Sequence, residues 1–136
     1  MSQREFRVVE EFFAALERRD MAAALALLDD DVDWVAPRSL PYGGVFHGRE
    51  GVAHGYFRGF LEHVDEDFGL TVHELIAAGD RVVGRLRLRG YGRLSGQPFD
   101  VPAVDVVAVR EGRIARLEYH ADTAALLRAL ELPAVA

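Results

Sequence analysis

The stretch FDVPAVDVVAVREGRIARLEYHA, residues 99–121, decides the fold. Two runs rich in apolar residues flank Glu111-Gly112-Arg113, and so short a turn joins neighbouring strands as an antiparallel hairpin. From Val101 to Val109 eight of the nine residues are apolar, and the ninth is Asp105. A carboxylate in that position needs a partner, a pocket or a raised pKa, so its surroundings bear on function as well as on fold.

Alternation of side chains sorts the faces of the predicted strands. Residues 70–79 and 81–93 predict a second hairpin, which turns at Gly79-Asp80. Arginines cannot line the dry side of a small domain, so Leu86 and Leu88 face inward and the row of Arg85, Arg87 and Arg89 faces outward. In the next strand both faces are apolar, so one face is expected to meet the helices and the other to meet something else, such as a second subunit. Alternation alone does not decide whether the face with Asp105 or the opposite face, with Val104, Val106 and Ala108, points inward.

The first half of the chain predicts helices. Residues 4–20 place apolar side chains at helical spacing, which gives a broad buried face: Phe6, Val8, Val9, Phe12, Phe13, Ala15 and Leu16. The other expected elements are a helix over 21–28 capped by Asp20, a strand over 31–36 stopped by Pro37, a loop over 37–48, a helix over 49–64, and a last helix over 123–132 capped by Asp122.

Helices followed by strands indicate an α+β fold, in which a strongly curved, mostly antiparallel sheet wraps around three N-terminal helices and ends in a short C-terminal helix. With 136 residues, we expect one domain spanning 1–136.

Composition excludes several classes of function. The net charge of −6 argues against nucleic-acid binding, the absence of cysteine and of a signal-like N-terminus suits a cytoplasmic protein, and no apolar run is long enough to span a membrane.

Three stretches resemble the nuclear-transport-factor-2-like superfamily in its SnoaL-like and ketosteroid-isomerase-like branch: VVEEFFAALERRDMAAALALLDDDVDW, GGVFHGREGVAHGYF and VVAVREGRIARLEYHADTAALL. Together the resemblance covers nearly the whole chain. It implies a cone-shaped α+β barrel with an apolar pocket at its wide end and, in many members, a homodimer formed through the outer face of the sheet. Because the superfamily mixes isomerases, cyclases, hydrolases, dehydratases and binding domains, the resemblance specifies the fold more closely than the activity.

Catalytic positions transfer from this superfamily only in part. The three functional positions of ketosteroid isomerases fall on Phe12, Ala36 and Asp105, so only the aspartate that donates a hydrogen bond is kept. The three positions of limonene-epoxide-hydrolase-like enzymes fall on Leu86, Leu88 and Tyr119, and none is kept. The catalytic aspartate of SnoaL-like cyclases also falls on Tyr119, which can donate a hydrogen bond but is a poor base.

Asp105 and Tyr119 are therefore the candidate catalytic residues. Asp105 is either a proton donor with a raised pKa in a pocket or a structural carboxylate bonded to Tyr119 or to a backbone N–H. Tyr42 is either a lid over the pocket or an ordinary turn residue. The residues expected to contact a ligand are Phe12, Trp34, Tyr42, Tyr56, Phe60, Leu86, Leu88 and Leu117.

Two functions fit these residues. One is a cofactor-independent isomerase, cyclase or dehydratase that acts on a hydrophobic carbonyl substrate such as a polyketide- or steroid-like compound. The other is a non-catalytic domain that holds a small hydrophobic ligand in the same pocket. His120 and Asp122 have no third ligand nearby in the sequence, so neither a metal nor a cofactor is expected.

Overall fold

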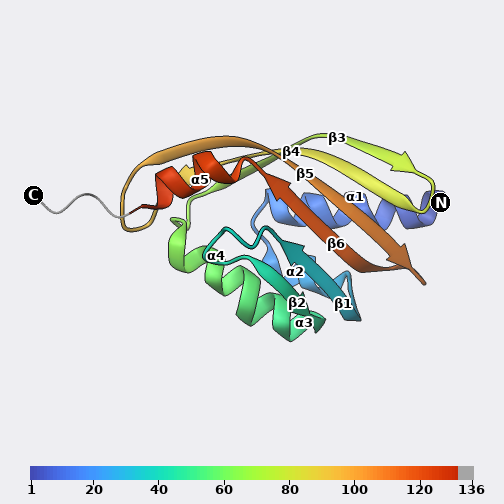
Figure 1. Ribbon diagram of the computed structural model, residues 1–136. Coiled ribbons are helices and arrows are strands. Elements are labelled where there is room, and N and C mark those ends of the chain that lie inside the picture. The colour runs from blue at the N-terminus through green and yellow to red at the C-terminus, as the bar shows by residue number, and fades with distance from the viewer. Residues whose placement is uncertain (132–136) are drawn as a thin grey trace, which may run out of the picture.

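The computed structural model describes residues 1–131, which form a six-stranded curved sheet with helices on one side (Figure 1). The strands are β1 (Leu28–Ala36), β2 (Gly44–His47), β3 (Gly69–Ala78), β4 (Arg81–Tyr91), β5 (Pro98–Arg110) and β6 (Arg113–Ala121). The helical elements are α1 (Gln3–Glu17), α2 (Met21–Ala26), α3 (Gly48–Gly51), the π-helical η1 (Val52–Phe57), α4 (Arg58–His63) and α5 (Thr123–Leu130). None of the helices described is long and apolar enough to cross a membrane.

The strands are ordered β2-β1-β6-β5-β4-β3, and every neighbouring pair is antiparallel except β1 and β6. Register shifts interrupt the β1–β6, β3–β4 and β5–β6 pairs. Such irregularities bend strands, and the long strands curve over α1 in the upper part of Figure 1. The fold class predicted from the sequence is confirmed.

The hairpin between β5 and β6 forms as its sequence predicts. Glu111 and Gly112 both have positive φ, at 52° and 76°, between the paired residues Arg110 and Arg113. Two central residues with positive φ match the twist of the adjoining strands, and glycine takes this conformation without steric cost. The hairpin places Asp105 directly opposite Tyr119.

Alternation along β4 and β5 also follows the prediction. Leu86, Leu88, Val101, Ala103 and Val107 are buried, whereas Val104 is 37% exposed. On the outer face Arg85 bonds to Glu74 at 2.9 Å, and Arg89 donates to Thr71 at 2.9 Å. The arginine row is therefore paired along the outside of the sheet.

Element boundaries differ from the sequence prediction in three places. Residues 44–47, expected within a loop, form strand β2, which pairs with β1. The second helix ends at Ala26, and Leu28 already belongs to β1, because Leu28 pairs with Ile114 of β6. The third helix contains the π-helical turn η1, which a simple spacing of four residues does not reveal. The caps at Asp20 and Asp122 are confirmed, while residue 132 of the expected last helix lies outside the described residues.

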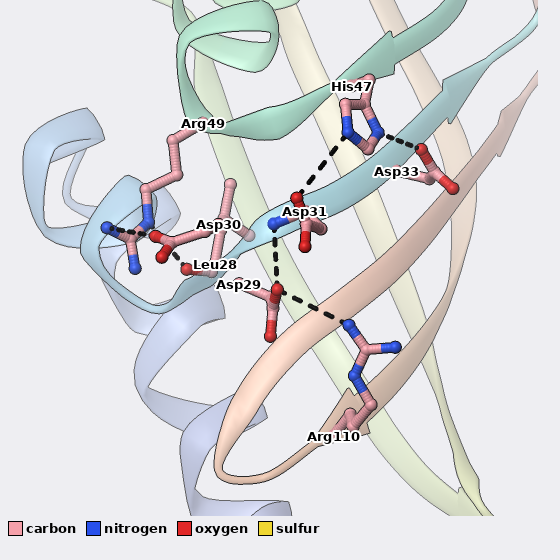
Figure 2. Close-up of polar contacts among 8 residues, drawn as sticks. All are labelled: Leu28, Asp29, Asp30, Asp31, Asp33, His47, Arg49 and Arg110. Atoms are coloured by element: carbon pink, nitrogen blue, oxygen red, sulfur yellow. Dashed lines mark hydrogen bonds and ion pairs between the residues drawn. The ribbon is translucent and has the colours of Figure 1, made fainter.

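An acidic cluster ties the start of β1 to its neighbours, as Figure 2 shows. His47 on β2 bonds through Nδ1 to Asp33 at 2.9 Å, and its Nε2 lies 3.9 Å from Asp31. Arg49 bonds to the Leu28 carbonyl at 2.8 Å and pairs with Asp30 at 3.1 Å. The hydrogen bond to Asp33 is the main cause that raises the pKa of His47, followed by the charges of Asp33 and Asp31. These charges stabilise the short edge strand β2 locally.

The loop that precedes β2 brings Tyr42 into the core. Two successive turns form it: Leu40 N–H bonds to the Pro37 carbonyl at 3.1 Å, and Gly43 N–H bonds to the Leu40 carbonyl at 2.9 Å. A Cβ atom at Gly43 would lie only 1.7 Å from the Pro37 carbonyl oxygen. The loop therefore depends on glycine at 43.

We expect Gly43→Ala to destabilise the protein by about 2 kcal/mol or more, because backbone atoms of the loop must shift to admit the methyl group. The matched control is Gly51→Ala, at a helical position with φ −60° where the nearest atom to an added Cβ is 3.8 Å away. That control should be neutral or stabilising by up to about 1 kcal/mol. Urea denaturation measures both, and equal stabilities of the two variants would contradict the close packing of this loop.

Candidate functional site

A cavity of about 70 Å³ lies between the curved sheet and the helices. Almost every side chain around it is apolar, and Asp105 is the only acidic one. The cavity is lined by Leu16, Met21, Trp34, Tyr56, Phe57, Phe60, Phe68, Leu70, Leu86, Leu88, Asp105 and Tyr119. The lining thus combines α1, α2, η1 and α4 with strands β1 and β3 to β6.

Asp105 lies in the middle of β5 and is only 4% exposed. On one side it faces Gly84 of β4, and on the other Tyr119 of β6. Gly84 offers no side chain, and the space beside it is occupied by Phe13 and Leu75, whose nearest atoms are 3.2 and 3.3 Å from where a Cβ would stand. The carboxyl group is consequently surrounded by apolar groups, and its Oδ1 has no hydrogen-bond partner among the described residues.

Burial raises the pKa of Asp105 to about 8. The cause is desolvation, because an apolar environment disfavours the ionised form. The arginines of β4 do not offset this shift, since their side chains lie on the outer face and bond there to Glu74 and Thr71. Asp105 is thus mostly a neutral acid at pH 7, able to donate a hydrogen bond.

Two further lining residues have buried polar atoms with no partner in the described part of the chain. They are Trp34, through its indole Nε1, and Tyr119, through its hydroxyl. Desolvation raises the pKa of Tyr119 well above its usual value, so this hydroxyl stays protonated. The hydrogen bond between Asp105 and Tyr119 offered as the structural alternative is not formed, although the two residues face each other across the strands.

Aromatic rings make up much of the cavity wall. The Trp34 ring centroid lies 5.0 Å from that of Tyr56 and 5.4 Å from that of Phe57. A π-helical turn has more residues per turn than an α-helix, and in η1 both adjacent residues, Tyr56 and Phe57, line the cavity. The rings of Phe12, Tyr56 and Phe57 pack around the indole of Trp34 and hold it in place.

Seven of the ten residues predicted to form the site line this cavity: Trp34, Tyr56, Phe60, Leu86, Leu88, Asp105 and Tyr119. Phe12, Tyr42 and Leu117 do not line it, although all three are buried. Phe12 packs behind Trp34 at 6.0 Å between ring centroids, and Tyr42 packs behind Phe60 at 5.5 Å. Tyr42 is therefore a core residue and not a lid.

Sequence reasoning missed five lining residues: Leu16, Met21, Phe57, Phe68 and Leu70. Leu16 belongs to the predicted apolar face of the first helix, so its burial was foreseeable but its place beside the cavity was not. Phe57 depends on the π-helical turn, which has no clear sequence signal. Within residues 1–131 no group of three or more His, Cys, Asp or Glu side chains is placed to hold a metal ion.

Fold and cavity together define a cone-shaped α+β protein of the nuclear-transport-factor-2-like type, with an apolar site enclosed between sheet and helices. The family described as the SnoaL-like domain matches residues 9–117, and the chain belongs to that family. No curated protein matches this chain.

Several solved structures share the fold. An NTF2-like protein of unknown function from Burkholderia pseudomallei is 32% identical, with a TM-score of 0.85 and coverage of 96% of this chain and 98% of that one. A protein of ketosteroid isomerase-like fold from Catenulispora acidiphila, solved with trimethylamine, is 22% identical, with a TM-score of 0.76 and 93% coverage of each chain. TerC, co-crystallised with polyporic acid, is 24% identical, with a TM-score of 0.81 and coverage of 94% and 98%.

The raised pKa of Asp105 predicts a specific dependence of stability on pH. Its folded-state pKa of about 8 lies above the ordinary value of 3.8, so the stabilisation is complete below about pH 4 and is lost as pH rises through about 8. The loss approaches about 1.4 kcal/mol per pH unit between these limits. Asp105→Asn, of nearly the same shape but unable to ionise, should remove this slope and be more stable than the wild type at pH 7.

The measurement is the free energy of unfolding in urea at intervals from pH 5 to 8. His47 also loses a stabilising interaction as pH rises through its raised pKa, but it does so equally in both proteins. The difference between wild type and Asp105→Asn therefore isolates Asp105. The exposed Asp67→Asn serves as control and should keep the wild-type slope. Parallel curves for wild type and Asp105→Asn would mean that Asp105 is not buried as described.

Proposed function

We propose that this protein binds a small, largely apolar molecule through an acceptor oxygen such as a carbonyl. The observation that carries the proposal is that three residues lining one apolar cavity each have a buried polar atom with no partner within residues 1–131: Trp34 Nε1, Asp105 Oδ1 and the Tyr119 hydroxyl oxygen. Buried polar atoms are nearly always hydrogen-bonded in native proteins, so such a set is typical of a site that a ligand completes.

The chemistry of the three groups selects the ligand. An indole N–H only donates, a neutral carboxyl donates one hydrogen bond, and a tyrosine hydroxyl donates or accepts. A carbonyl oxygen accepts two hydrogen bonds, so it can satisfy two of these groups at once. An anion held only by neutral donors would lose its hydration in this apolar cavity, so a neutral carbonyl compound fits better. That two proteins of the same fold were solved with trimethylamine and polyporic acid supports a role in binding small organic molecules.

The volume of the cavity limits which part of the ligand can enter. An apolar cavity of about 150 Å³ holds a benzene ring, whereas a single water needs about 10–15 Å³. A cavity of about 70 Å³ therefore takes a polar head of a few atoms and not a ring system. A polyketide- or steroid-like compound would need the walls to move.

A second candidate function is catalysis at such a carbonyl, and the pKa of Asp105 favours it. A carboxyl with a pKa of about 8 exchanges protons readily near neutral pH, as a general acid or base requires. The ionised minority of Asp105 would take a proton from the carbon beside the carbonyl, and Tyr119 and Trp34 would stabilise the enolate oxygen by donating hydrogen bonds. The neutral acid formed in this way would then return the proton to carbon. Many isomerase, cyclase and dehydratase reactions that act beside a carbonyl without a cofactor include this step.

Binding is tested with 2-butanone and its isosteric alkene, 2-methyl-1-butene. Trp34 is the only tryptophan, so a nitrogen–proton correlation spectrum of the labelled protein contains a single indole signal. We expect the ketone to move that signal downfield and the alkene to leave it nearly unchanged. Asp105→Ala, followed through the indole signal, should weaken ketone binding by about 1 kcal/mol, roughly fivefold, without affecting the alkene. Trp34→Phe lacks the indole, so its binding is followed through saturation transfer to the ligand protons, and the same weakening is expected. Equal responses to both compounds would contradict the proposal.

Catalysis is tested by hydrogen–deuterium exchange at the carbon beside the carbonyl of 2-butanone in D₂O. Accelerated exchange that disappears in Asp105→Asn, while ketone binding persists, would support an enzyme. Binding without acceleration would leave the non-catalytic function.

We also propose that the chain, as one SnoaL-like domain, forms a cytoplasmic homodimer through the outer face of the sheet. An apolar row crosses three strands there, because Ile76 is paired with Val83 and Val83 with Val106. Ile76 and Val104 are 42% and 37% exposed, and apolar strips of this kind often mark interfaces.

Sedimentation velocity at tens of micromolar should give a dimer, with a dissociation constant on the order of 10 μM or lower. Ile76→Glu should shift the equilibrium to monomer, since it places a charge at an exposed position of this apolar row, opposite Val83. Leu94→Glu, at a site 71% exposed and outside that strip, is the matched control and should remain dimeric. A wild-type protein that sediments as a monomer would contradict the proposed interface.

A further inference from the structure

A shallow apolar groove of about 430 Å³ runs along the outside of the helices, between α2 and the continuous η1–α4 helix. Leu25 of α2, Ala53 of η1 and Leu61 of α4 line it. Met21 and Phe57 line it as well, and both of them also line the cavity that contains Asp105. Groove and cavity therefore share these two side chains as a common wall.

The two side chains of this wall differ in conformational freedom. Phe57 is buried and packs edge-on against Trp34 at 5.4 Å between ring centroids. Met21, by contrast, is half-buried on the first turn of a helix only six residues long, and methionine has three rotatable side-chain bonds. A change of Met21 rotamer is thus the simplest way to join the cavity to the groove.

The charged side chains of the groove also limit which kind of ligand segment it can bind. Its charged side chains, Arg58 and Glu62, pair with each other one helical turn apart at 3.6 Å. Neither charge is left to attract an ionic group, while the remaining lining is apolar. An uncharged hydrocarbon segment suits this surface.

We propose that the groove holds the apolar tail of the same ligand whose carbonyl head lies beside Asp105. In this proposal Met21, which lines both cavity and groove, determines which tails can pass from one to the other. The inference rests on the proposed function. It limits the ligand to a carbonyl compound with a slender, uncharged chain, because the cavity alone takes only a few atoms and the tail must pass the wall of Met21 and Phe57 to reach the groove.

The experiment compares 2-butanone with 2-decanone on the full chain, by titration of the Trp34 indole signal. If the tail lies in the groove, each added methylene should tighten binding by up to about fourfold until the groove is filled. Leu61→Gln, which makes the groove polar without touching the cavity, should remove most of the gain for 2-decanone and leave 2-butanone unchanged. Leu94→Gln, the same substitution on an exposed leucine elsewhere, should bind both ketones as the wild type does.

Met21 is tested separately with Met21→Ala and Met21→Phe. The smaller side chain should speed the association of 2-decanone, and the stiffer, bulkier one should slow it, with a smaller effect on 2-butanone.

The outcomes separate the two proposals. If 2-butanone binds but 2-decanone binds no more tightly, or if Leu61→Gln leaves the preference for 2-decanone intact, the groove is not the tail site while the proposed function stands. If neither ketone binds, the proposed function fails and the inference fails with it.

Discussion

The constraint on which the rest of this site depends is a carboxyl group buried on the apolar inner face of the sheet, whose Oδ1 has no hydrogen-bond partner within residues 1–131. An isolated buried carboxylate costs many kcal/mol, so Asp105 is held as the neutral acid, with its pKa raised to about 8. In that form it is a hydrogen-bond donor, and two other residues lining the cavity have donors without a partner within residues 1–131, Trp34 Nε1 and the Tyr119 hydroxyl. In the binding function proposed above, the charge state of Asp105 would set the kind of molecule that the cavity binds.

The fold maintains this arrangement by keeping cations away and apolar groups close. Alternation along β4 directs its arginines to the outer face, where Arg85 and Arg89 bond to Glu74 and Thr71. Gly84 offers no side chain to Asp105 from the neighbouring strand. On the helical side, the π-helical turn presents Tyr56 and Phe57 together to Trp34. Each feature lowers the polarity around Asp105 or fixes the donors beside it.

Much of the fold follows from local patterns in the sequence, and the exceptions are instructive. The hairpin turn at Glu111-Gly112 is a property of neighbouring residues and forms as predicted. The inward position of Asp105 also forms, but it followed from the family resemblance, because both faces of its strand are apolar. Strand β2 was not foreseen, because four residues pair with β1 only once the loop ending at Gly43 has brought them there. The cavity wall was foreseen in part: Leu86 and Leu88 follow from strand alternation, whereas Met21 and Phe57 depend on how separate helices pack. Short-range periodicity identifies buried residues, but it does not tell which of them border an empty space.

The most direct test of this account is a titration of the Asp105 carboxyl carbon by carbon-detected NMR, assigned by comparison with Asp105→Asn. We expect a pKa near 8, with the carboxyl protonated at neutral pH. Saturation with 2-butanone should raise this pKa further, because the ketone accepts a hydrogen bond from the protonated form alone. A value at or below about 3.9, that of a free aspartate, would show an ordinary ionised carboxylate and contradict the central claim.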